Sequence, residues 1–312
     1  MADWILKNKT EYEVVGIDSL FGGYIENVSP NIIFYKRNLV VDDISDIFES
    51  HNFEYVFHFA AYAAEGLSPF MRKFNYSNNI LSTVAIINEC ITHNVKRLIY
   101  TSSMSVYGWG NEQGVRFVEE DQPKPIDPYA ISKYACEMDI NGLDWCIIRP
   151  HNVYGIGQNI WDKYRNVLGI WMYQIINNEN ISIYGDGEQT RAFSYIDDCL
   201  EPFWNAAVSE KASKEIINVG GINGYTINEA ANIILDITGY EHSKIQHFEP
   251  RNEVKWCVPS HKKSIDILGY NEKTTLREGL TKMWEWAKKQ PNRQQYKWKN
   301  YEITKGIYEY WE

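Results

Sequence analysis

The sequence has 312 residues, with 31 lysines and arginines against 41 aspartates and glutamates, which gives a formal charge of −10. This length suits about two domains, or one large α/β domain with a smaller appendage. The negative balance argues against a nucleic-acid-binding surface, because such surfaces need clustered Lys and Arg. No apolar run reaches the roughly 18 residues of a membrane span, so we expect neither nucleic acid nor a membrane among the partners.

The cysteines are scattered and form no C-x-x-C pair, which predicts neither a disulfide framework nor a zinc site. We expect reduced, mostly buried thiols and no bound metal. No signal peptide precedes the first polar residues, so the expected compartment is the cytoplasm. The five cysteines are Cys90, Cys136, Cys146, Cys199 and Cys257.

Short apolar runs alternate with helix-length segments along the first half of the chain. The predicted strands cover 13–18, 32–35, 55–59, 97–101 and 145–149. Nearly continuous apolar strands predict a parallel sheet covered on both faces, and the β–α alternation is typical of a doubly wound sheet. Ser68 and Pro69 predict the N-cap and first position of a helix that continues over 70–94.

The pattern loosens after about residue 155. Helices are predicted over 167–177, 197–208, 226–238 and 275–290, and a short strand over 181–184. Thr275 and Glu278 have the spacing of a capping box. The aromatic and charged tail from Pro291 is predicted to lie packed on the surface. We expect two interleaved parts, 1–155 and 156–312, with a soft boundary.

The strongest chemical pattern is the pair Tyr129 and Lys133, with Ser103 upstream at the end of a predicted strand. Residues four apart share one face of a helix, and an adjacent ammonium lowers the pKa of a phenol from its ordinary value of about 10. With Ser103 on the same substrate hydroxyl, this group could take a proton from an alcohol while hydride leaves the same carbon. A Tyr-x-x-x-Lys pattern alone is weak, but Asp127 and Pro128 at the helix start and the Ser-rich strand end strengthen it.

Asp18 stands at the carboxyl end of the first predicted strand. There it could accept two hydrogen bonds from a ribose cis-diol and repel a 2′-phosphate, which favours NAD over NADP. The alternative, a strand-end turn acid, is favoured on this residue alone. Ala60 and Ala61 follow another strand, where small side chains permit either close approach of a cofactor or ordinary packing on a helix. His58 is expected to be a satisfied core histidine.

Two further polar positions follow strands or turns of the predicted sheet. Arg191 comes after the turn Gly185-Asp-Gly187 and could pair with a diphosphate through its planar guanidinium. Asn152 places an amide just beyond the fifth predicted strand. Each could be structural alone, but together they fall at the carboxyl edge of the sheet, where ligands bind in doubly wound folds.

Six segments together resemble the extended short-chain dehydrogenase/reductase family of nucleotide-sugar epimerases and dehydratases. They are VVGID (14–18), HFAA (58–61), YTSSMSVYG (100–108), DPYAISK (127–133), RPHNVYG (149–155) and GDGEQTRAFSYIDD (185–198). The resemblance covers nearly the whole chain and is specific because the segments occur together. It implies an NAD-binding Rossmann fold with a smaller C-terminal substrate-binding lobe.

The resemblance also implies roles for the residues that match the family motifs. Tyr129 would be the base, Lys133 would orient it and bind the nicotinamide ribose, and Ser103 would relay the proton. The other residues implied to contact NAD are Asp18, Ala60, Ala61 and Asn79. The other residues implied to contact a nucleotide-sugar substrate are Asn152, Arg165, Asn166, Arg191 and Arg251.

The residues after Ser103 help to choose the reaction. Family members that are 4,6-dehydratases place Asp and Glu there for water elimination, whereas this chain has Met104 and Ser105. The sequence therefore looks more like a 4-epimerase, closest to UDP-glucose 4-epimerase, in which a 4-keto sugar rotates and takes the hydride back on its other face. A small residue at Cys257, if it matches the family's gating position, would also admit UDP-N-acetylglucosamine.

Two departures from the family pattern keep other hypotheses open. The family opens with a strand and a G-x-x-G-x-x-G turn that binds pyrophosphate, whereas Met1 to Leu6 resemble the middle of the helix after that turn. Only nine residues, 134–142, separate Lys133 from Leu143, where the family usually has a longer helix that helps to form a homodimer. The alternatives are a nucleotide-sugar-binding protein without turnover, and a 4-reductase or other epimerase on the same scaffold.

Overall fold

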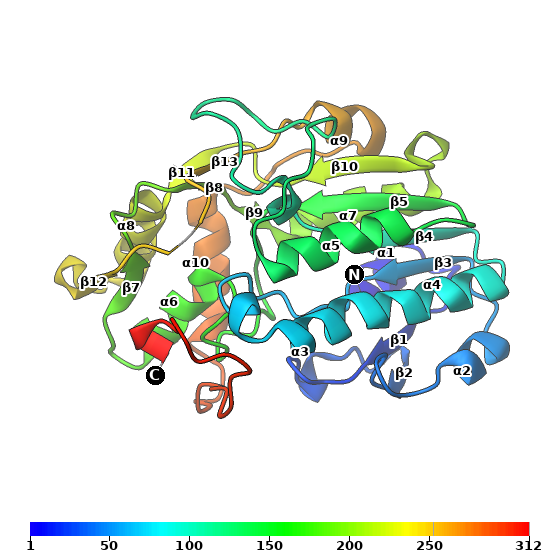
Figure 1. The fold of residues 1–312 in the computed structure, drawn as a ribbon, viewed down its shortest axis with the longest axis horizontal. Coiled ribbons are helices and arrows are strands. Elements are labelled where there is room, and N and C mark those ends of the chain that lie inside the picture. The colour runs from blue at the N-terminus through cyan, green and yellow to red at the C-terminus, as the bar shows by residue number, and fades with distance from the viewer. Residues whose placement is uncertain (252, 312) are drawn as a thin grey trace.

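Four parallel strands, in the order β10-β5-β4-β3, form the main sheet of the computed structural model, which describes residues 1–251 and 253–311 (Figure 1). They are β3 (Tyr55–His58), β4 (Arg97–Thr101), β5 (Trp145–Pro150) and β10 (Glu215–Val219). β1 (Val15–Asp18) and β2 (Ile33–Lys36) form a separate parallel pair. Within the described residues no ladder joins this pair to β3. The five strands predicted for the first half are confirmed.

Helices cover both faces of the main sheet and also build most of the smaller lobe. The helices are α1 (Ala2–Asn8), α2 (Ser45–Ser50), α3 (Arg72–Tyr76), α4 (Ser82–Thr92), α5 (Pro128–Asp139), α6 (Val167–Ile176), α7 (Ile196–Val208), α8 (Ile227–Thr238), α9 (Lys262–Leu268) and α10 (Leu276–Ala287). The remaining strands are β6 (Val153–Tyr154), β7 (Ile181–Tyr184), β8 (Thr190–Ala192), β9 (Ser194–Tyr195), β11 (Gly224–Thr226), β12 (Ile245–Phe248) and β13 (Trp256–Cys257). Helix α1 agrees with the helical character expected at the start of the sequence.

The main sheet is buried on both faces because its strands alternate apolar side chains between them. On β4, Leu98 and Tyr100 belong to one core cluster, which also contains Cys136 of α5. Ile99 belongs to the opposite cluster, with Phe203 of α7. In Figure 1, α4 and α5 lie in front of the sheet and α7 lies behind it. This is the doubly wound arrangement that the sequence predicts.

The single helix predicted after Ser68 is wrong in its first part. Residues Ser68–Phe70 form a 3-10 turn, α3 follows, and a π-helical turn over Ser77–Leu81 connects it to α4. The Ser68 side chain does not cap the helical segment that follows it. Its hydroxyl donates to the carbonyl oxygen of Glu65 at 2.8 Å and accepts from the Tyr129 amide at 3.1 Å. These tertiary bonds compete with the local cap that the Ser-Pro sequence suggests.

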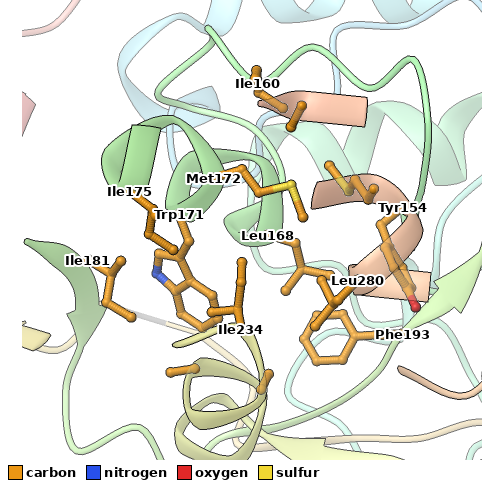
Figure 2. Close-up of a cluster of buried hydrophobic side chains, with 14 of the residues drawn as sticks. Tyr154, Ile160, Leu168, Trp171, Met172, Ile175, Ile181, Phe193, Ile234 and Leu280 are labelled. Carbon is orange, nitrogen blue, oxygen red and sulfur yellow. The ribbon is translucent and has the colours of Figure 1, made fainter. Parts of the chain in front are cut away.

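A second core holds the smaller lobe together. Figure 2 shows Trp171 and Met172 of α6 packed with Ile181 of β7, Ile234 of α8 and Leu280 of α10. The predicted capping box of α10 is present, because the Thr275 side chain accepts from the Glu278 amide and the Glu278 carboxylate accepts in return. β10 comes from the second half of the chain and pairs with β5. The two halves are thus interleaved in space, while a boundary near 155 stays a prediction.

The tail, residues 291–311, crosses from the smaller lobe to the start of α3 (red in Figure 1). The Glu302 carboxylate accepts from the amides of Lys73 and Phe74 at 2.7 and 2.8 Å. Trp311 is only 3% exposed and packs against the rings of Phe70, Tyr164 and Tyr308. The tail is packed as the sequence predicts, but Trp311 is a core residue rather than a surface one.

Several side-chain predictions can be checked directly. His58 is buried, and its Nε2 lies 2.8 Å from the Thr83 hydroxyl, so it is the satisfied core histidine expected. All five cysteines are free and buried. In the described part of the chain, no helix has the length and apolarity needed to cross a membrane, and no cluster of His, Cys, Asp and Glu has metal-binding geometry.

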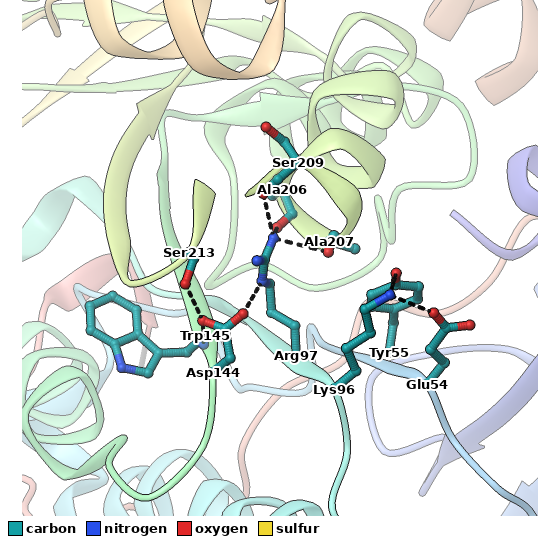
Figure 3. Close-up of polar contacts among 10 residues, drawn as sticks. All are labelled: Glu54, Tyr55, Lys96, Arg97, Asp144, Trp145, Ala206, Ala207, Ser209 and Ser213. Atoms are coloured by element: carbon teal, nitrogen blue, oxygen red, sulfur yellow. Dashed lines mark hydrogen bonds and ion pairs between the residues drawn. The ribbon is translucent and has the colours of Figure 1, made fainter. Parts of the chain in front are cut away.

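Arg97 fixes β4 to the carboxyl end of α7 (Figure 3). Its guanidinium donates to Asp144 at 2.7 Å and to the carbonyl oxygens of Ala206, Ala207 and Ser209 at 3.2, 3.0 and 2.6 Å. The last carbonyls of a helix have no partner within it, so a buried cation here satisfies them. The contact matters for the site, because β4 leads directly to Ser103.

Replacing Arg97 is therefore expected to be costly, and its neighbour Lys96 provides the control. We expect Arg97→Met to lower the free energy of unfolding by roughly 3 kcal/mol, because it leaves buried carbonyls and Asp144 unpaired. Lys96→Met should lower it far less than Arg97→Met does, because the Lys96–Glu54 pair is exposed. Urea unfolding measures both. Equal losses in the two variants would contradict this account.

Candidate active site

A cavity of about 760 Å³ opens at the carboxyl ends of β4 and β5 and extends between the two lobes. Its wall contains most of the residues that the sequence predicts for a site. Those on the wall are Ala61, Ser103, Tyr129, Lys133, Asn152, Arg165, Asn166, Arg191 and Arg251. Residues from positions 61 to 251 thus line one cavity. This is expected at the carboxyl ends of the strands of a doubly wound sheet, where the strand order reverses.

Helix α5 presents Tyr129 and Lys133 to this cavity from its first turns. The Asp127 side chain accepts from the Ala130 amide at 2.9 Å and forms the N-cap, with Pro128 at the first helical position. Because the helix begins there, Tyr129 and Lys133 fall on one face, 6% and 3% exposed. The predicted helix start and the predicted pairing on one face are both present.

Lys133 is held at the end of β4. Its Nζ donates to the Thr101 carbonyl oxygen at 2.7 Å and lies 5.1 Å from the centre of the Tyr100 ring. Burial lowers the pKa of Lys133 to about 8. At pH 7 the amine therefore still carries its proton, and it can stabilise a negative charge on a neighbouring group.

The protonation of Tyr129 depends on opposing neighbours. Burial raises the pKa of Tyr129 first, and the negative charge of Glu65 raises it further. A hydrogen bond with the Ser103 side chain lowers it. Ser103 is itself held by its neighbour, since the Ser105 hydroxyl donates to the Ser103 Oγ at 2.9 Å. A cation close to the phenol is therefore needed to make Tyr129 a base at neutral pH.

The residues predicted to bind a dinucleotide lie in different environments. Ala61 lines the cavity, and Ala60 beside it is exposed. Asp18 ends β1, is exposed, and accepts from the Leu20 amide at 2.6 Å, which is the geometry of a turn acid. Asn79 is buried and bonds the Tyr62 backbone and other side chains. Binding by these residues stays a prediction.

Arg191 and Asn152 project from adjoining segments of the smaller lobe. The Arg191 guanidinium donates to the Glu253 carboxylate at 2.8 Å. Asn152 has φ of 31°, a left-handed conformation that asparagine tolerates, and its side-chain amide donates to the Ala192 carbonyl at 3.4 Å. Both lie on the cavity wall with their backbones fixed, so they can offer polar groups to a ligand at this edge.

Arg165 and Asn166 line the same cavity from the start of α6. Asn166 caps this helix by accepting from the Leu168 amide at 3.0 Å. Arg165 lies 3.0 Å from the Asp162 carboxylate and 4.7 Å from the centre of the Tyr62 ring. Both residues thus have structural partners, which set the direction of their side chains beside the cavity.

Arg251 is enclosed by aromatic rings that come from two distant segments. Its guanidinium carbon lies 3.3 Å from the centre of the Tyr184 ring, 5.0 Å from that of Tyr308 and 4.9 Å from that of Trp311. We call these three rings the aromatic cage. Its Nε is buried and has no hydrogen-bond partner among the described residues. The ring faces of the cage therefore hold the guanidinium in place. They do not use its N–H groups as hydrogen-bond donors, so these stay available to a ligand.

Sequence reasoning missed the cage and Glu65, which also line or border the cavity. It also did not indicate that Glu253 pairs with Arg191. The aromatic-rich tail was the only signal for the cage. Cys257 was singled out, and its Sγ does lie on the cavity wall, 3.6 Å from the Met104 sulfur.

Comparisons with known proteins agree with this geometry. Residues 4–220 match the family described as the NAD dependent epimerase/dehydratase family. A putative UDP-glucose 4-epimerase of Methanocaldococcus jannaschii is 27% identical over 92% of this chain and 94% of its own length. Two solved structures that resemble the chain cover more than 90% of it.

The first structure is UDP-glucose 4-epimerase of Thermotoga maritima with UDP-glucose, with a TM-score of 0.84 and 30% identity over 91% of this chain and 93% of that one. The second is UDP-glucuronic acid 4-epimerase of Bacillus cereus with UDP-glucuronic acid and NAD, with a TM-score of 0.82 and 25% identity over 92% and 94%. Both agree with the Rossmann-type fold.

The lowered pKa of Lys133 predicts how stability depends on pH in the ligand-free protein. The pKa of this amine is about 8 in the folded state and 10.5 when the amine is exposed. The buried charge therefore lowers the free energy of unfolding below pH 8, and this loss disappears as the pH rises toward 10.5. Relative to Lys133→Met, the free energy of unfolding should rise by about 2 kcal/mol between pH 7 and pH 9.5. Chemical denaturation across this range measures it.

An exposed lysine gives the control for this measurement. Lys7→Met, on an exposed position of α1, should follow the pH dependence of the unchanged protein. If the free energy of unfolding of Lys133→Met also changes in parallel with that of the unchanged protein between pH 7 and pH 9.5, the amine is not desolvated as described.

Proposed function

This chain belongs to the NAD dependent epimerase/dehydratase family, and we propose that it interconverts the two configurations at C4 of a nucleotide sugar of the UDP-glucose and UDP-galactose type. One observation carries the proposal: Tyr129, Lys133 and Ser103 share a cavity with Arg191 and Arg251. The first three suit proton transfer at a sugar hydroxyl. The two guanidiniums suit a diphosphate.

The cavity wall fits the family's cofactor. The hydroxyls of Thr101 and Ser102 are buried at the end of β4 without a hydrogen-bond partner among the described residues, and both residues line the cavity beside Ala61. Such orphaned groups are costly unless a ligand satisfies them. NAD bound there would accept a hydride from C4 and return it. Lys133 would hold its nicotinamide ribose, and Asp18 its adenosine ribose.

The chain's own residues then handle protons and position. Tyr129 takes the proton of the 4-hydroxyl and later returns it, while Ser103 hydrogen-bonds the same oxygen. The Lys133 ammonium stabilises the phenolate that is present before the first transfer and again after the second. Inversion at C4 requires the 4-keto sugar to present its other face, and the cavity of about 760 Å³ leaves room for that rotation. Arg191 and Arg251 would hold the diphosphate meanwhile.

Dehydration is not favoured at this site. Met104 and Ser105 stand where an acid and a base for water elimination would be needed, and a thioether cannot transfer protons. Ser105 is already bonded to the Ser103 hydroxyl at 2.9 Å. Cys257 has a small side chain on the cavity wall, so UDP-N-acetylglucosamine belongs among the substrates to be tested.

The proposal is tested with Tyr129→Phe. We expect kcat for interconversion of UDP-galactose and UDP-glucose to fall by at least about 1,000-fold, because the variant keeps the ring but has no proton to exchange. Tyr134→Phe, on the same helix, is the control and should keep its activity. Chromatography of the two nucleotide sugars measures both.

Two outcomes contradict the proposal. The first is the absence of interconversion by the unchanged protein supplied with NAD, and the second is equal activity of Tyr129→Phe and the unchanged protein. A protein that binds UDP-sugar but does not turn it over would instead support the binding-protein hypothesis. A net reduced product at C4 would support a 4-reductase.

The aromatic cage generates a separate prediction. If Arg251 contacts the diphosphate or nucleotide, Trp311→Ala should raise KM for the nucleotide sugar about tenfold, because a partly buried cation–π contact is worth about 1–2 kcal/mol. kcat should change less than about threefold, since Tyr129 and Lys133 are untouched. Trp311→Phe keeps an aromatic face and should restore most of the KM. Steady-state kinetics that show kcat falling while KM stays constant would contradict this role.

A further inference from the structure

Glu65 is a carboxylate on the cavity wall for which the reaction described above has no use. It lines the same cavity as Ser103 and Tyr129, and its side chain is exposed to that space. Among the described residues, its carboxylate makes no ion pair and no hydrogen bond, in contrast to Asp127 and Glu253 in the same wall. It is therefore free to act on whatever occupies the cavity.

The backbone places Glu65 beside the reacting end of the cavity. The Ser68 hydroxyl donates to the Glu65 carbonyl oxygen at 2.8 Å and accepts from the Tyr129 amide at 3.1 Å, so one side chain joins the two residues. The next residue, Gly66, is close to the aromatic cage: a Cβ there would lie 3.3 Å from the Trp311 ring and 3.4 Å from Arg251 Nη1. Glu65 thus lies between the catalytic phenol and the cage.

The neighbouring charged groups do not neutralise the negative charge of the Glu65 carboxylate. Arg191 is the cation that acts on Glu65 most strongly, but it is committed to Glu253 at 2.8 Å. Desolvation by the surrounding wall, followed by the negative charge of Asp127, raises the pKa of Glu65 to about 7, so the carboxyl is ionised only above that pH. In the other direction, Glu65 is the charge that most raises the pKa of Tyr129. A field that reaches the phenol also reaches the sugar carbon whose hydroxyl the phenol would bind.

We propose that Glu65 makes the sugar pocket selective by charge, so that it accepts nucleotide hexoses with a neutral hydroxymethyl group at C5 and rejects nucleotide uronic acids. The proposal rests on the proposed function, because it assumes that C4 lies at Tyr129. The C6 carboxylate of a uronic acid is two bonds from C4, and it would meet the Glu65 carboxylate in a cavity of low dielectric constant, where like charges repel strongly. Specificity of this kind comes from a repulsive element against the wrong substrate.

The test compares two substrates, UDP-glucose and UDP-glucuronic acid, in matched variants of the full chain with NAD at pH 8.5, where Glu65 is ionised. For the unchanged protein, we expect kcat/KM for UDP-glucuronic acid to be at least 100-fold below that for UDP-glucose. Glu65→Gln keeps the shape and removes the charge, and it should narrow this ratio at least tenfold. Glu65→Asp keeps the charge and should keep the discrimination. Glu49→Gln, which removes one charge from an exposed position of α2, should leave the ratio unchanged.

Two results would overturn the proposal. One is a ratio of kcat/KM values that is the same in Glu65→Gln as in the unchanged protein. The other is an unchanged protein that has equal kcat/KM for UDP-glucuronic acid and UDP-glucose. Failure of this proposal is distinguishable from failure of the proposed function. If the unchanged protein epimerises neither substrate, calorimetric Kd values for UDP-glucose and UDP-glucuronic acid still give the ratio for each variant. Thermal unfolding of Glu65→Gln verifies that the variant is folded.

Discussion

The hydrogen bond from the Lys133 amine to the Thr101 carbonyl oxygen, at 2.7 Å, is the contact on which the site depends. It fixes the first turns of α5 against the end of β4, and so it brings Tyr129 to Ser103. Burial keeps the amine out of water and lowers its pKa to about 8, although the bond itself favours the charged form. Burial therefore costs stability and holds a cation on the face of α5 that carries the phenol.

The arginines on the cavity wall are held in different ways. Arg165 and Arg191 have carboxylate partners at 3.0 and 2.8 Å, and Arg251 is held by ring faces. A bound dianion would meet cations whose positions are already set, so little side-chain entropy would be lost on binding. Among the described residues Glu65 has no such partner, and its negative charge also raises the pKa of Tyr129 in the same wall.

The sequence was sufficient for elements whose signals are local. Apolar runs located β3, β4 and β5, the Thr275 capping box located α10, and the motif around Tyr129 located α5. Contacts between distant segments were not predictable, because no local pattern specifies them. Ser68, for example, has the local sequence of a helix cap, but its hydroxyl bonds the backbone of Glu65 and Tyr129. The homodimer also stays a prediction: Ile131 and Met138 are exposed on α5, at 40% and 60%, and nothing described here covers them.

The tail that carries Tyr308 and Trp311 has a consequence for how the protein matures. Its contacts with Phe70 and Phe74 span more than 220 positions, as the bonds from Lys73 and Phe74 to Glu302 show. Contacts of such long range form slowly, since loop closure must precede them. During synthesis the Rossmann-type half can fold early, but Arg251 gains the rings of Tyr308 and Trp311 only after the tail has left the ribosome. In a nascent chain, helix α5 with Tyr129 and Lys133 would thus form before the aromatic cage around Arg251 is complete.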